Sequence, residues 1–94
     1  MITHVVLFKV QEPVQENAEA IAARLRAMEG KVAGLDGIEV GVDFNRSERA
    51  WDVALITRHA SKEALATYQA DATHNEVKAF IGEKSAGAAV VDFF

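Results

Sequence analysis

The chain has 94 residues and a net charge of −4, and half of its residues are hydrophobic. This length and composition predict one folded domain over residues 1–94, and the scattered Lys and Arg residues argue against nucleic acid as a partner. The absence of cysteine excludes disulfides, thiolate nucleophiles and Cys-ligated metals.

The first segment, "MITHVVLFKV", is apolar but is not typical of a signal peptide. It lacks a basic start and a small-residue cleavage site, and Lys9 interrupts it early. No segment approaches the roughly 20 apolar residues that span a bilayer. The sequence therefore predicts a cytoplasmic protein with no membrane partner.

Residues 2–10 are β-branched and aromatic and predict a strand. Both faces of this strand are largely apolar. On one face the imidazole of His4 is the only polar side chain. The residues of this face are Ile2, His4, Val6, Phe8 and Val10.

Pro13 suits the first turn of a helix, where its missing N–H costs nothing. From Val14 to Leu35 apolar residues recur at steps of three and four, which predicts one long amphipathic helix. Gly34 and Gly37 are expected to bracket its end.

Two alternating segments follow, "IEVGVDFN" over residues 38–45 and "WDVALITRHA" over residues 51–60. In the first, Phe44 is expected on the same side as Ile38. The polar segment "NRSERA" separates the two, which predicts a β-hairpin. His59 is expected to be an exposed residue at a strand edge.

The remaining segment predicts two short helices and a closing strand. Ser61 is a candidate N-cap for "SKEALATYQAD", and Thr73 with Glu76 fits a capping box for "HNEVKAFIGEK". The chain is expected to break near Asp71, and "GAAVVDFF" is expected to form the last strand.

The resulting order, β-α-β-β-α-β with a split second helix, predicts an α+β protein with a ferredoxin-like four-stranded antiparallel sheet. A sheet covered by helices on one side usually has polar residues on the other. The first and third strands are apolar on both faces, so the second face is expected to be covered by a second copy of the sheet in a homodimer.

Three segments together resemble the stress-responsive dimeric α/β-barrel (Dabb) family: "THVVLFKV", "GIEVGVDFNRSERAWDVALITRHASKEALATYQADATH" and "VVDFF". The resemblance covers nearly the whole chain. It implies a ferredoxin-like subunit whose dimer forms an α/β barrel. Most members of the family have no assigned reaction.

One plant member, olivetolic acid cyclase, closes a polyketide ring by a cofactor-free aldol-type reaction. Its two catalytic histidines and its helix tyrosine resemble His4, His74 and Tyr68 by position. Many members read H-P-x-H where this chain reads "DATH", so Asp71 replaces the first histidine and Ala72 replaces the proline. The long helix here also lacks the aromatic residues of that relative.

Two imidazoles and a phenol around an apolar cavity suffice to remove a proton next to a carbonyl and to polarise its oxygen, with no cofactor. His74 at a helix start is expected to be biased toward its neutral form by the helix dipole. Each residue also has a structural explanation: His4 as a hydrogen-bonded core residue, His74 as a packed first-turn residue and Tyr68 as an amphipathic helix end.

Other acidic residues do not form a recognisable metal motif. The candidates for magnesium are Asp43, Asp52, Asp71, Glu76 and Asp92. Three functions therefore remain open: a cofactor-independent enzyme acting on a polyketide-like or other carbonyl compound, a non-catalytic stress-associated protein that binds an apolar small molecule, and a cofactor-free monooxygenase-like barrel.

Overall fold

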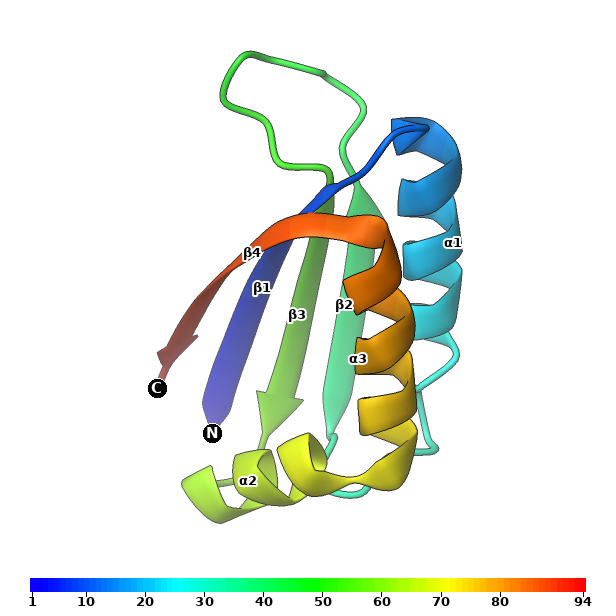
Figure 1. Ribbon diagram of the computed structural model, residues 1–94. Helices are drawn as coiled ribbons and strands as arrows, with labels where there is room; N and C mark the ends of the chain where they lie inside the picture. Colours follow the sequence, from blue (N-terminus) through cyan, green and yellow to red (C-terminus); the bar gives the residue numbers. More distant parts are fainter.

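The computed structural model describes residues 1–94 and has the predicted order of elements. The strands are β1 (Ile2–Val10), β2 (Gly37–Val42), β3 (Val53–His59) and β4 (Ser85–Phe93), and the helices are α1 (Val14–Arg26), α2 (Lys62–Ala70) and α3 (Ala72–Lys84). The strands form one antiparallel sheet in the order β2-β3-β1-β4. Helices α1 and α3 lie on one face of this sheet, and α2 lies at its lower end (Figure 1). The predicted ferredoxin-like α+β fold is therefore confirmed.

The core lies between the sheet and the helices. Residues of the two central strands alternate between the buried face and the opposite face, as the period of a strand requires. The buried ones are Ile2, His4, Val6, Phe8 and Val10 of β1, and Val53, Leu55, Thr57 and His59 of β3. No helix is both long enough and apolar enough to cross a membrane.

The opposite face of the sheet has no helix over it (Figure 1). Strand pairing brings five apolar residues together there, which are Val5, Leu7, Ile56, Val91 and Phe93. Of these, Val91 is 61% exposed and Phe93 is 49% exposed. The prediction that the central strands are apolar on both faces is confirmed.

The first helix is shorter than the sequence predicts. It ends at Arg26, and the following residues form turns in which Gly30 and Gly34 adopt φ values of 74° and 80°. The predicted extension to Leu35 is wrong because the apolar spacing continues past the helix end. Met28 and Val32 remain buried although they lie outside the helix.

Gly34 packs directly against α2. A Cβ atom at this position would lie 2.3 Å from the carbonyl oxygen of Ala64 and 3.1 Å from the backbone nitrogen of Tyr68. Its own carbonyl oxygen lies 2.6 Å from Nδ1 of His59. Only glycine combines the left-handed backbone with this close approach.

Two further local predictions are wrong. Asp71, not Thr73, caps α3, because its carboxylate accepts hydrogen bonds from the N–H groups of Thr73 and His74. Strand β2 ends at Val42, so Phe44 lies in the loop and is 92% exposed. The alternation of the sequence thus continues beyond the last residue that pairs with β3.

The Gly34 contact predicts a large difference between two glycine substitutions. Gly34→Ala is expected to lower the free energy of unfolding by more than about 2 kcal/mol, because it adds a backbone clash to the strain of a left-handed residue. Gly30→Ala has the same strain but nothing within 4 Å of the added Cβ, so it is expected to cost only about 1 to 2 kcal/mol. Urea denaturation of both variants measures the difference, and equal losses would contradict the close packing of Gly34.

Candidate active site

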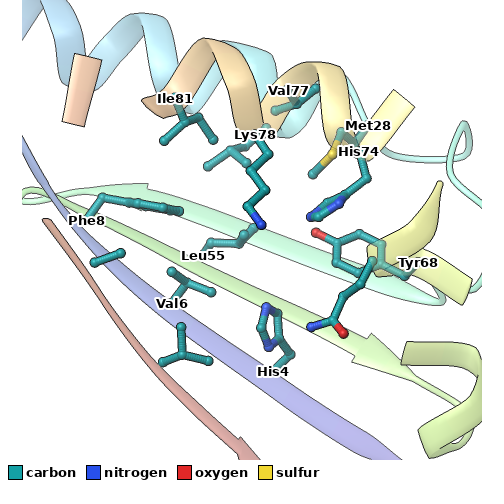
Figure 2. Close-up of a pocket in the computed structure, with 14 residues that line it drawn as sticks. His4, Val6, Phe8, Met28, Leu55, Tyr68, His74, Val77, Lys78 and Ile81 are labelled. Atoms are coloured by element: carbon teal, nitrogen blue, oxygen red, sulfur yellow. The ribbon is translucent and has the colours of Figure 1, made fainter. Parts of the chain in front are cut away.

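A cavity of about 460 Å³ lies between the inner face of the sheet and helix α3. Ten of its fourteen lining residues are hydrophobic, which is typical of small-molecule sites. The other four are His4, Gln69, His74 and Lys78, and Tyr68, one of the ten, adds a hydroxyl. Figure 2 shows His4 on the side of the sheet, and Tyr68, His74 and Lys78 on the side of α2 and α3.

All three predicted site residues line this cavity. Tyr68 lies between the other two: its ring centroid is 4.3 Å from that of His74 and 6.3 Å from that of His4. His59 adds a third imidazole, 4.7 Å from Tyr68. The only tyrosine of the chain is therefore surrounded by all three of its histidines.

His4 is held by the last strand. Its Nδ1 contacts a carboxylate oxygen of Asp92, the residue directly opposite on β4. Since an ionised carboxylate only accepts hydrogen bonds, Nδ1 carries the proton and donates it, which leaves Nε2 as the free base. From the sequence alone Asp92 is only a candidate magnesium ligand, because nothing in the sequence shows which residue pairs with His4.

Tyr68 lies in the last turn of α2 and is completely buried. Its hydroxyl makes no hydrogen bond of normal geometry, although the Thr57 hydroxyl lies near enough to influence its pKa. Burial raises the pKa of Tyr68 to about 12, and the nearby Thr57 hydroxyl opposes this rise only in part. Tyr68 is therefore protonated at neutral pH, and its hydroxyl is a free donor at the cavity wall.

His74 lies in the first turn of α3 and is half-buried. Burial lowers the pKa of His74 below its usual value of 6.5, and the positive charge of Lys78 lowers it further. Its Nδ1 is buried without a hydrogen-bond partner. A neutral imidazole and a free phenol thus share one side of the cavity.

His59 is completely buried, so the prediction that it is an exposed edge residue is wrong. Strand β3 lies between β2 and β1, and His59 points to the same face as Leu55 and Thr57. Its Nδ1–H donates to the carbonyl oxygen of Gly34, and its Nε2 lies 2.8 Å from the hydroxyl of Thr57. Both nitrogens are therefore satisfied, and His59 packs against Tyr68 without lining the cavity.

Asp71, which replaces a histidine of the family motif, does not line the cavity. Partial desolvation raises its pKa, but hydrogen bonds from the N–H groups of Thr73, His74 and Ala33 outweigh this and lower the pKa. The carboxylate ties the start of α3 to the turn after α1. Its role in the structure is that of a helix cap.

The acidic residues do not converge on a common point. No group of three or more His, Asp and Glu side chains is arranged to hold a metal ion. Asp52 instead accepts hydrogen bonds from the N–H of Val10 and the guanidinium of Arg46, at 2.8 Å each. Through these two hydrogen bonds Asp52 holds the loop between β2 and β3 against the end of β1.

The fold and the cavity define a small ferredoxin-like protein with an apolar pocket between its sheet and its helices. The model of the stress-responsive A/B barrel domain (Dabb) matches residues 2–94. The chain therefore belongs to the Dabb family. No functionally curated protein matches the sequence.

Solved structures with the same fold come from several organisms. A dimeric protein of unknown function from Bacteroides fragilis is 26% identical, with a TM-score of 0.85 over 98% of this chain and 93% of that chain. A dimeric protein of unknown function from Thermobifida fusca is 22% identical, with a TM-score of 0.85 over 98% and 88% of the two chains. The hydroxynitrile lyase from Passiflora edulis is 13% identical, with a TM-score of 0.82 over 98% and 90%. The similarity to the structures from Thermobifida fusca and Passiflora edulis is a similarity of fold alone.

The lowered pKa of His74 predicts a loss of stability on acidification. Because the pKa is lower in the folded chain than in the unfolded chain, the unfolded chain binds the proton more readily. Neutral His74 therefore makes its full contribution to the free energy of unfolding above a pH of about 6.5, and this contribution is lost as the pH falls below that value.

Urea denaturation at several pH values tests this linkage with His74→Gln, which cannot titrate. The free energy of unfolding of the unchanged chain is expected to fall relative to the variant as the pH falls from about 7.5 to about 5.5. A constant difference between the two proteins across this range would contradict the lowered pKa.

Proposed function

We propose that this Dabb protein is a cofactor-independent enzyme that acts on an apolar carbonyl compound, in the manner of a polyketide cyclase. In this proposal His4 is the base, His74 is the acid, and Tyr68 orients the substrate. The reaction begins with removal of a proton from the carbon next to a carbonyl group.

One observation carries the proposal: two buried polar atoms at the same cavity wall make no hydrogen bond of normal geometry within the protein. They are the hydroxyl of Tyr68 and Nδ1 of His74. Leaving such a group unsatisfied costs about 1 to 3 kcal/mol, so folded proteins seldom do so without a reason. A carbonyl oxygen bound beside both residues would remove this cost, and it is the acceptor that the Tyr68 hydroxyl lacks.

The proposed steps follow from the hydrogen bonds of each side chain. Nε2 of His4 takes the proton from the carbon, while Asp92 stabilises the imidazolium that forms. The negative charge moves to the carbonyl oxygen, which accepts a hydrogen bond from Tyr68. The carbon then attacks a second carbonyl group of the same molecule, and the N–H of neutral His74 supplies a proton to the new alkoxide. The imidazolium of His4 gives up the proton that it took, through solvent, to His74, so both imidazoles end neutral.

The apolar lining of the cavity also suits a non-catalytic protein that binds an apolar small molecule. In that case the histidines and Tyr68 would only bind the ligand. A cofactor-free monooxygenase-like reaction has no separate observation in its favour. An assay of proton removal distinguishes the enzyme from the binding protein.

The enzyme is expected to accelerate exchange of hydrogen for deuterium at the carbon next to the carbonyl of aryl alkyl ketones in D₂O, measured by NMR. His4→Gln is expected to lower the rate at least about 100-fold, because it removes the base. Tyr68→Phe is expected to lower it about tenfold or more through loss of one hydrogen bond to the oxygen.

The stability of Tyr68→Phe is the control for this assay. Removal of a buried hydroxyl that has no partner is expected to leave the free energy of unfolding unchanged or higher. Binding of the ketones without any exchange would favour the non-catalytic alternative. Exchange that survives in His4→Gln would refute the assignment of the base.

We also propose that the chain forms a homodimer through the open face of its sheet, which makes an α/β barrel. Val5, Leu7, Ile56, Val91 and Phe93 form an uncovered apolar surface there, and such surfaces mark interfaces. The similar structure from Bacteroides fragilis is described as dimeric. The cytoplasmic location expected from the sequence remains a prediction.

Two neighbouring valines of β4 test the interface. Val91 belongs to the open face and is 61% exposed, whereas Val90 lines the cavity and is 53% exposed. Sedimentation at micromolar concentration is expected to show a dimer for the unchanged chain and for Val90→Lys, and a monomer for Val91→Lys. A monomer for the unchanged chain would refute the dimer.

A further inference from the structure

Lys78 is the one lysine or arginine among the lining residues of the cavity. It lies on α3 one turn after His74, and residues four apart on a helix lie on the same side. Figure 2 shows its side chain extending from α3 across the cavity, with the amino group above Leu55.

The ammonium group of Lys78 has no acidic partner. The ion pairs of the chain join Arg46 to Asp43 and Asp52, and Arg58 to Glu39, and Asp92 contacts His4. No Asp or Glu lines the cavity. Asp92 does not line the cavity, but its carboxylate contacts the lining residue His4. A bound molecule therefore meets the amino group of Lys78 with no carboxylate among the lining residues to pair with it.

The charge lies near the groups proposed to do the chemistry. The effect of Lys78 on the pKa of His74 shows that the two side chains interact electrostatically. In the view of Figure 2 the amino group of Lys78 ends at Leu55, above His4 and to the left of Tyr68. An anion bound to Lys78 would thus lie beside, and not at, the proposed carbonyl position.

We propose that Lys78 selects a carbonyl substrate that also carries a carboxylate, so that the substrate class is an apolar keto acid and not a neutral ketone or ester. This inference rests on the proposed function, which supplies the position of the reacting carbonyl group. The carboxylate pairs with the ammonium group, the apolar body fills the cavity, and the carbonyl oxygen lies at Tyr68 and His74.

The test compares β-benzoylpropionate, a stable aryl keto acid, with its methyl ester, which has the same skeleton without the charge. Calorimetry measures both affinities for the unchanged chain, Lys78→Met and Lys78→Arg. Lys78→Met is expected to lower the ratio of acid affinity to ester affinity about three- to fivefold, the effect of one partly exposed ion pair. Lys78→Arg is expected to keep the ratio.

Lys31→Met is the matched control, because Lys31 is also exposed but does not line the cavity. It changes the net charge by the same amount and is expected to leave the ratio unchanged. Added salt is expected to lower the ratio for the unchanged chain, since salt screens exposed charges.

Several results would overturn the proposal: no measurable binding of the acid, an unchanged ratio in Lys78→Met, or an equal drop in Lys31→Met. Covalent trapping of the ketone on Lys78 by cyanoborohydride would also overturn it, because the lysine would then be a nucleophile and not an anion site. Deuterium exchange in the same compound, next to its ketone, is measured separately. Selectivity for the acid without deuterium exchange supports the Lys78 site and refutes the proposed enzyme. Deuterium exchange without selectivity for the acid supports the proposed enzyme and refutes the Lys78 site.

Discussion

The site depends on the close approach of the Gly34 turn to helix α2. Because Gly34 has no side chain, its backbone comes within contact of Ala64 and of the backbone nitrogen of Tyr68. Its carbonyl oxygen fixes the ring of His59, against which Tyr68 packs. Tyr68 then lies at the centre of the histidines. The position of the phenol is thus set by a residue that is not in contact with the cavity.

The sequence predicted the parts of the site that depend on local periodicity. Alternation along residues 2–10 placed His4 on the apolar face, and the break between two helices placed Tyr68 and His74 near each other. In both cases the prediction rests on the spacing of apolar residues within one strand or one helix, because the apolar side of each element is the side that is buried. The order of the elements then sufficed for the ferredoxin-like fold.

The parts that were missed depend on contacts between distant segments. Asp92 could not be assigned to His4, because the register of β1 against β4 is a tertiary property. The role of Asp71 as a cap depends on a break of one residue, which the T-x-x-E pattern obscured. His59 differs from these: its spacing of two from Thr57 and four from Leu55 already placed it on the buried face, and only the strand order was lacking.

The pair of His4 and Asp92 joins the first strand to the last, across 88 positions of the chain. Bringing residues this far apart together costs loop-closure entropy, which the pairing of β1 with β4 offsets. A slip of one residue between β1 and β4 would turn Asp92 to the open face and leave His4 without its carboxylate. The arrangement of His4 therefore depends on the register of β4 against β1: a chain whose last strand is misaligned would lose the oriented imidazole.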